Sequence, residues 1–458
     1  MFDNNQVRHY TGVFDILGEQ ITGELIYNKQ NGLIVLNLIK ELSDKNIFGN
    51  SFGTLSVITG KLNFGSHVTL FNNRCTKNHT EAFKSQQLNF IAESMIWSNT
   101  YRKTSKYNKL TCVLENAYQW SELSVFEMTN SGIRVKESID KKVYNWFGAE
   151  ITFSTYLSNF LYSPPKEEKT EIIQRLVVEI ELIEKKEFKD FLLIRNKIIS
   201  LITFAMKNNV NIHEQYLIDN DQFYMVGERV VEHYKHYLIT NDVQLDIYKN
   251  QSMNYNFVLS QLPNDKNINE TLTKLEPVFN LYLSVVRYCD MPIEMMFLNI
   301  VQALETFHSR FFYDNKKKVY VASVIERFGN TPNYEWIKEL LLCDTQMDEN
   351  CNYIILVSRL NDLLIGKYDG MFYEYYGENR EYAQIIADTR HYYTHYGKSK
   401  ENKALKGDEL LDAIYILKIL LEYHVCLVLG VDNHEKISRE LHNHHEWRKL
   451  GFIQSGKT

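Results

Sequence analysis

Proline is scarce in this sequence, and no run of about 18 consecutive apolar residues occurs. Only 6 of the 458 residues are proline, whereas disordered chains are rich in it, so we predict a mostly folded protein. The lack of a long apolar run predicts that no helix crosses a membrane. The opening residues, MFDNNQVRHYTG, lack the basic-then-apolar order of a secretion signal, so we predict a cytoplasmic protein.

Cysteine and several common motifs are also lacking. The 6 cysteines include no CxxC pair, which argues against a disulfide framework and against a cysteine-based zinc site. No Walker-type glycine loop, GxSxG or HExxH is present, which excludes the commonest kinds of ATPase, esterase and zinc protease. The formal net charge of −6 argues against a broad basic surface that coats nucleic acid.

What is present predicts a multidomain α+β protein with two different parts. Residues 1–250 are mainly strand-like, because apolar runs alternate with turn residues and Asn31-Gly32 is a hairpin signal. Residues 251–274 are polar, and we predict a linker there. Residues 275–432 carry apolar side chains at helical spacing and predict an all-α helical bundle.

The end of the bundle has its own signals. Asp408 is a plausible N-cap of the last long helix, and Gly430 is a plausible residue to stop it. Residues 433–458 are predicted to form a polar, His-rich tail. Its four histidines are dense enough to bind a metal, but their spacing does not place them on one helical face, so we predict a solvated tail and no metal site; they are His434, His442, His444 and His445.

The stretch RHYYTHY, residues 390–396, concentrates an arginine, two histidines and three tyrosines. It lies on a predicted helix whose packed stripe repeats at helical spacing. Arg390 borders this stripe, and a half-buried arginine needs an anion or a carboxylate such as Glu305 as its partner. The predicted stripe consists of Tyr382, Ile385, Ile386, Thr389, Tyr393 and Tyr396.

Arg390 and His395 have the chemistry to cleave RNA. Arginine binds phosphate and stabilises charge that develops at phosphorus, and histidine moves a proton near neutral pH. An RNA 2′-OH could attack the adjacent phosphate and leave a 2′,3′-cyclic phosphate. The lysines that follow directly could hold the phosphate backbone; they are Lys398, Lys400, Lys403 and Lys406.

The spacing of the pair leaves alternatives open. Five residues along a continuous helix put Arg390 and His395 about 140° apart. Either Gly397 ends the helix and lets His395 swing from its last turn, or the two residues act with copies from a second subunit. Taken alone, the spacing also occurs by chance: His395 could cap a helix end, and the lysines could form a solvated loop.

The combination of features resembles the HEPN superfamily. Its signature is an arginine, a polar residue and then a histidine after four to six intervening residues, which Arg390, His391 and His395 match on the penultimate long helix of the bundle. The stretch is similar to the signature of ApeA-like HEPN proteins, and Phe297–Phe312 resembles the first long helix of that group. In the N-terminal part, GKLNFGSHVTLF and ITFSTYLSNF resemble the ApeA N-terminal domain.

The resemblance implies a ribonuclease that needs neither metal nor cofactor and that acts in bacterial antiphage, abortive-infection defence, with tRNA as its substrate. It implies a homodimer formed through the helical domain. Arg390 and His395 carry over as the catalytic pair. His391 stands where asparagine is usual, and it could orient Arg390 or contact RNA. Glu305 is either a supporting acid or a surface or helix-capping glutamate.

The remaining predictions concern RNA contacts and regulation. Lys398, Lys400 and Lys403 are candidate RNA-binding residues, together with Tyr393 and Tyr396, for which packing is the stronger interpretation. The N-terminal part is expected to control access to the site or to report a phage component. Two alternatives remain: a non-catalytic HEPN module that binds RNA or protein, and a purely structural bundle.

Overall fold

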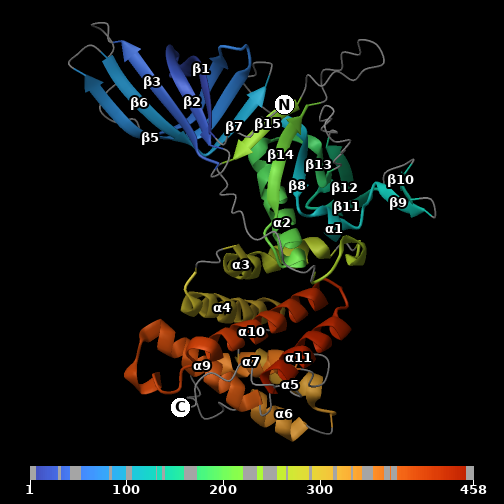
Figure 1. The fold of residues 1–458 in the computed structure, drawn as a ribbon. Coiled ribbons are helices and arrows are strands. Elements are labelled where there is room, and N and C mark those ends of the chain that lie inside the picture. The colour runs from blue at the N-terminus through green and yellow to red at the C-terminus, as the bar shows by residue number, and fades with distance from the viewer. Residues whose placement is uncertain are drawn as a thin grey trace. The chain divides into compact units, whose positions relative to one another are not determined.

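The computed structural model describes most of the chain, in ranges separated by gaps. The described residues are 7–28, 32–41, 53–81, 85–98, 106–129, 132–136, 140–158, 173–219, 235–240, 255–264, 267–287, 291–312, 317–331, 334–342, 354–365, 372 and 379–449. The chain divides into two compact units (Figure 1). The N-terminal unit comprises Met1–Asn196 and Val210–Lys249, and the C-terminal unit comprises Lys197–Asn209 and Asn250–Thr458.

Among the described residues, the N-terminal unit is built on one 13-stranded sheet in which neighbouring strands run antiparallel. The strands follow the order β11-β12-β13-β8-β14-β15-β7-β5-β4-β1-β2-β3-β6. A separate hairpin pairs β9 with β10. The strands are β1 (Val7–Ile16), β2 (Glu19–Asn28), β3 (Ile34–Glu41), β4 (Thr54–Leu62), β5 (His67–Glu81), β6 (Ser85–Ala92), β7 (Ser94–Ser98), β8 (Lys106–Glu115), β9 (Phe126–Thr129), β10 (Gly132–Val135), β11 (Lys142–Trp146), β12 (Ala149–Ser158), β13 (Ile173–Glu187), β14 (Asn211–Ile218) and β15 (Lys235–Thr240).

Six of these strands close into a ring, because β6 pairs with β5 as well as with β3. Alternate side chains point inward, as period-2 strands require, and form a buried core that includes Phe14, Leu36 and Phe90. A glycine is needed at position 60, since a Cβ there would lie 2.4 Å from the ring of Phe14. The predicted hairpin around Gly32 is confirmed: β2 pairs with β3, and Gly32 has a left-handed φ of 67°.

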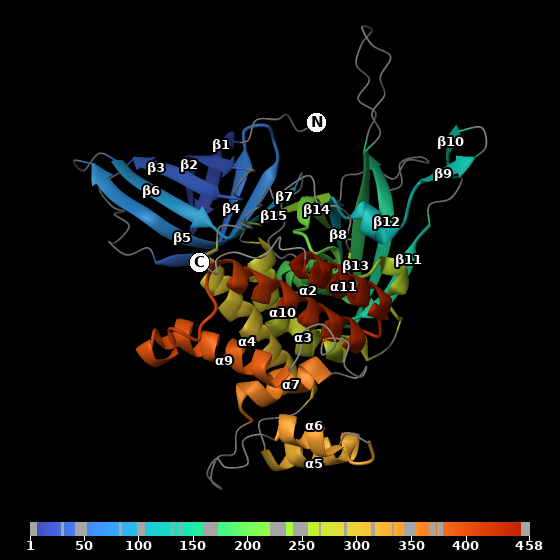
Figure 2. The same ribbon diagram turned by 60° about the horizontal axis from the view of Figure 1, so that its bottom comes forward.

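The C-terminal unit is helical, so the predicted mixed α+β fold class is confirmed. Helix α4 lies at its centre and packs against α3, α7, α9 and α10 (Figure 2). Its apolar residues recur at helical spacing, and Phe297, Ile300, Leu304 and Phe307 are fully buried. The helices are α3 (Ile268–Arg287), α4 (Ile293–Phe311), α5 (Lys317–Phe328), α6 (Tyr334–Leu341), α7 (Leu356–Ile365), α9 (Asn379–His395), α10 (Gly407–Val428) and α11 (His434–Lys449).

Four further elements, three of them short, complete the description of the residues that the structure covers. Helix α1 (Tyr118–Ser121) lies in the N-terminal unit, and the 3₁₀ turns η1 (Leu259–Gln261) and η2 (Lys398–Lys400) lie in the C-terminal unit. Helix α2 (Phe188–Met206) follows β13; it begins in the N-terminal unit and ends in the C-terminal unit. No helix among the described residues is long and apolar enough to cross a membrane.

The predicted linker and tail both contain helix. Within 251–274, α3 begins at Ile268, because Ile268, Leu272 and Leu275 recur at helical spacing and bury their side chains. The polar tail predicted from residue 433 instead forms α11, whose Ile437 and Leu441 lie four residues apart and are fully buried. Those two apolar residues bury the core-facing side of α11 in the unit.

The boundaries of α10 confirm one signal and correct another. The helix begins at Gly407 with Lys406 at the N-cap position, so Asp408 lies in its first turn, where a carboxylate favours the helix dipole. Gly430 ends it as predicted, with a left-handed φ of 74°. The N–H of Gly430 donates to the carbonyl of Leu427, and that of Val431 to the carbonyl of Cys426, which is a Schellman motif.

Candidate active site

Helix α9 carries the RHYYTHY stretch and ends within it. His395 is the last helical residue, and Tyr396 adopts a left-handed φ of 49°. Gly397 has an ordinary φ of −74°. The sequence predicted that Gly397 ends the helix, but the left-handed residue that ends it is Tyr396. The N–H of Tyr396 still donates to the carbonyl of Tyr392, at 2.5 Å.

The buried face of α9 differs from the predicted stripe at two positions. Ile386, Thr389 and Tyr393 are buried as predicted. Ile385 is 38% exposed and Tyr396 is 67% exposed, so neither belongs to the core. The Tyr393 hydroxyl donates to the carbonyl of Leu405, at 2.9 Å, and this bond ties the following loop to the helix.

Arg390 lies beside Glu305 of α4. Their side chains approach to 3.5 Å between Nη2 and Oε2, and they are 37% and 29% exposed. Within the part of the chain that the structure describes, the guanidinium therefore has one carboxylate neighbour and an open side toward solvent. An arginine held in this way can bind a phosphate through its remaining N–H groups.

His391 and His395 lie one turn apart on α9. Their ring centroids are 4.9 Å apart, and both side chains are exposed. No hydrogen bond joins Arg390 to His395 within the described residues, in keeping with their five-residue spacing. The structure thus brings together two pairs, Arg390 with Glu305 and His391 with His395.

The predicted RNA-binding residues do not form a single group. Lys398 and Lys403 are exposed, whereas Lys400 lies 2.5 Å from the carboxylate of the buried Asp388. Tyr396 is exposed, but Tyr393 is buried against Phe297 and cannot offer its ring face to a base. The burial of Tyr393 favours packing, the stronger of the two interpretations of this residue, because α9 turns its ring into the bundle.

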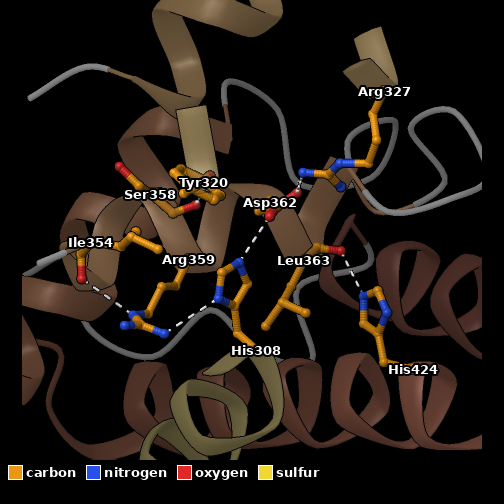
Figure 3. A network of polar contacts seen from close by, with 9 residues as sticks. All are labelled: His308, Tyr320, Arg327, Ile354, Ser358, Arg359, Asp362, Leu363 and His424. Atoms are coloured by element: carbon orange, nitrogen blue, oxygen red, sulfur yellow. Dashed lines mark hydrogen bonds and ion pairs between the residues drawn. The ribbon is translucent and has the colours of Figure 1, made fainter. Parts of the chain in front are cut away.

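Below Glu305 lies a buried polar network that the sequence interpretation missed. His308, one turn after Glu305 on α4, is fully buried between Arg359 and Asp362 of α7 (Figure 3). Arg359 Nη1 donates to His308 Nδ1 at 3.4 Å, so Nδ1 accepts and His308 is neutral. Its Nε2–H then donates to Asp362 Oδ2 at 2.8 Å.

The electrostatics of this network agree with a neutral histidine. Burial lowers the pKa of His308 and outweighs the opposite effect of Asp362. Burial also lowers the pKa of Arg359, whereas the negative charge of Glu305 acts to raise it. Glu305 therefore stands between two arginines, Arg390 at the surface and Arg359 in the interior.

Two further contacts extend the network. Arg327 donates to Asp362 Oδ1 at 2.9 Å, and His424 of α10 donates to the carbonyl of Leu363 at 2.8 Å. The spacing of these residues in the sequence could have indicated the network. Glu305 and His308 lie three residues apart and so share a helix face, and the same holds for Arg359 and Asp362. One histidine of α11 serves packing, since His444 contacts Asp412 at 2.7 Å and stacks on Tyr415.

Two family models match the chain. The model described as ApeA N-terminal domain 1 matches residues 9–270, which is more than half of the chain. The model described as Apea-like HEPN matches residues 298–435.

This chain belongs to the ApeA-like HEPN family.

The HEPN match contains the whole candidate site of this ApeA-like HEPN protein. Glu305, Arg390, His391 and His395 all lie within residues 298–435. The resemblance stated from the sequence is thereby confirmed. Among curated proteins and solved structures, nothing matches the chain.

Proposed function

We propose that this ApeA-like HEPN protein is a metal-independent endoribonuclease of bacterial antiphage defence, with tRNA as its substrate. The observation that carries the proposal is the exposed end of α9. There, two imidazoles lie 4.9 Å apart on the same helix as a guanidinium that is anchored by Glu305. Two imidazoles can move protons and a guanidinium can stabilise charge on a phosphate. RNA cleavage by attack of a 2′-OH on phosphorus requires both functions.

The mechanism assigns one step to each group. One imidazole of the His391–His395 pair takes the proton of an RNA 2′-OH, and the freed oxygen attacks the adjacent phosphorus. The other imidazole donates a proton to the departing 5′-oxygen. The bond to the 5′-oxygen breaks, so the products are a 2′,3′-cyclic phosphate and a 5′-hydroxyl.

Arg390 stabilises the charge that develops on the non-bridging phosphate oxygens. Its fork of N–H donors matches a phosphate, and Glu305 holds the guanidinium without burying it. Lys398 and Lys403, both exposed just beyond the helix end, hold the flanking backbone.

The proposal includes a homodimer formed through the helical unit. Ile385 lies exposed on α9, on the helix that also presents His391 and His395. Pairing through α9 would bring two sets of catalytic groups into one cleft. The N-terminal unit, which has no catalytic motif of its own, senses a phage component and restrains the nuclease in the host cytoplasm.

The test is RNA cleavage in a bacterial host that carries the wild-type protein or a variant, with and without phage. We expect wild-type cells to accumulate discrete tRNA fragments ending in cyclic phosphate after infection. Arg390→Ala and His395→Ala should abolish them. Arg310→Ala and His442→Ala change exposed residues of the same two types in the same unit and serve as matched controls.

A different outcome would support the non-catalytic alternative. If His395→Ala protects the host as well as the wild type does and tRNA stays intact in both, the protein acts as a HEPN module that binds RNA or protein. The end chemistry is also decisive, since fragments with a free 3′-hydroxyl contradict attack by the 2′-OH.

A further inference from the structure

The C-terminal unit contains a pocket that includes none of the catalytic residues. It measures about 470 Å³ and lies between the segment around Tyr255 and the first two turns of α11. This volume falls in the range of small-molecule sites, roughly 300–1,000 Å³. The pocket therefore has room for a ligand of the size of a nucleotide.

Asn433 gives the pocket wall a buried amide without a partner. The residue stands just before α11, is 6% exposed, and lines the pocket. Neither its Oδ1 nor its Nδ2 has a hydrogen-bond partner among the described residues. Since buried polar groups are almost always paired, this amide points to a ligand that supplies both a donor and an acceptor.

The capping role that asparagine usually plays at this position is taken by a neighbour. The N–H of His434 donates to Asp432 Oδ1 at 3.1 Å, and the carbonyl of Asn433 accepts from the N–H of Ile437. The backbone of Asn433 thus serves the helix while its side chain does not.

Two cationic side chains lie on the same side of the pocket, which the carboxylates of Asp432 and Glu440 line as well. Lys436 and Arg439 line it from the first two turns of α11, at the helix end that carries the positive partial charge. Neither forms an ion pair with a carboxylate among the described residues. Glu440, which also lines the pocket, is already occupied, because Lys207 lies 3.2 Å from its carboxylate.

We propose that this pocket binds a nucleoside monophosphate unit. The amide of Asn433 pairs with the donor–acceptor edge of the base, as asparagine does with nucleobases elsewhere. Lys436 and Arg439 bind the phosphate, and Tyr255 adds an aromatic ring to the wall. The unit is either a free nucleotide or one unpaired nucleotide of an RNA chain, and the inference does not depend on the proposed nuclease activity.

The test is calorimetric titration of the full-length protein with AMP, GMP, CMP, UMP, their nucleosides, inorganic phosphate and a single-stranded RNA pentamer. At least one nucleotide or the pentamer should bind, and a nucleotide that binds should do so about tenfold or more tightly than its nucleoside. Asn433→Leu should lower nucleotide affinity by about tenfold or more. Arg439→Ala, at an exposed position, should weaken the nucleotide but not the nucleoside.

The arms of the experiment separate the outcomes. Equal affinity for nucleotide and pentamer identifies a free nucleotide as sufficient, whereas binding of the pentamer alone, with the same dependence on Asn433 and Arg439, identifies an RNA nucleotide. The proposal is overturned if nothing binds, if phosphate alone binds as tightly, or if both variants bind like the wild type. Arg390→Ala should leave this binding unchanged while abolishing cleavage, so the two proposals fail independently.

Discussion

Two sets of arginine, histidine and carboxylate lie in the same helical unit and differ chiefly in burial. The surface set is Arg390, His391 and His395 with Glu305, and the buried set is Arg359, His308 and Asp362 with Arg327. Glu305 and His308 lie one turn apart on α4, so the two sets begin on the same helix. Residues of the same types are therefore buried in one set and exposed in the other, although the two sets begin one helical turn apart.

This difference in burial determines which histidines can exchange protons with a substrate. In the buried set His308 bonds to both Arg359 and Asp362, and it is fixed as a neutral group whose pKa is lowered by burial. Such a histidine cannot exchange protons with a substrate. In the surface set the imidazoles are exposed and Arg390 keeps an open side, which is what proton transfer and phosphate binding require.

The largest effect should come from breaking the buried set. Asp362→Ala removes the acceptor of both His308 and Arg327 in the interior, so we expect the C-terminal unit to lose about 3–5 kcal/mol of unfolding free energy. Denaturant unfolding followed by circular dichroism measures this loss. Asp408→Ala, which changes an exposed carboxylate of α10, is the control, and equal losses in the two variants would contradict the contrast.

The next effect belongs to the surface set. Arg390→Lys keeps the charge but removes the planar fork, so we expect cleavage to fall about 10²-fold, or about 2.7 kcal/mol of transition-state stabilisation. Stability should not change, because the side chain is already 37% exposed. Rates on the RNA cleaved by the wild type measure the effect. Full activity of the lysine variant would show that the guanidinium geometry is not used.

A third effect concerns acid sensitivity. Burial lowers the pKa of His424 to about 4, whereas in the unfolded chain it lies near the ordinary 6.5. Between these values the unfolded state binds the proton and the folded state does not, so stability falls as pH falls. From pH 7 to pH 5 this one histidine should cost about 2 kcal/mol.

His424→Gln is the variant that measures this term, since glutamine keeps an N–H donor for the carbonyl of Leu363. Its unfolding free energy should decline less steeply between pH 7 and pH 5 than that of the wild type. Parallel curves for the two proteins would mean that His424 titrates in the folded state.

The smallest effect is a difference in stability between two tyrosine variants of the RHYYTHY stretch. Tyr393→Phe removes a hydroxyl that donates to Leu405, so we expect a loss of about 1 kcal/mol in unfolding free energy. Tyr396→Phe should change it by less than about 0.5 kcal/mol, because Tyr396 is 67% exposed. Thermal unfolding of both variants measures the difference, and a reversed order would contradict the assignment of the buried face.

Part of the site could be predicted from the sequence. The chemistry of arginine and histidine, together with the resemblance to the HEPN superfamily, pointed to Arg390 and His395, and the need of an arginine for a carboxylate pointed to Glu305. The buried face of α9 was predicted less well, because spacing alone does not show where a neighbouring helix stops covering a side chain. For that reason Ile385 and Tyr396 were assigned to the core, although both are exposed.

The sequence by itself determined the local elements: the strand-rich first half, the helices of the second, and the end of α10 at Gly430, because period, turn residues and helix caps are properties of neighbouring residues. Only the tertiary structure decided which polar residues meet. His308 and Asp362 are 54 positions apart in the chain, and Asn433 and Tyr255 line one pocket from distant segments. The burial of a polar side chain and the partner that it meets depend on how helices pack against one another. Helix packing is therefore the reason why arginine, histidine and carboxylate form a buried network in one place and an exposed candidate site in another.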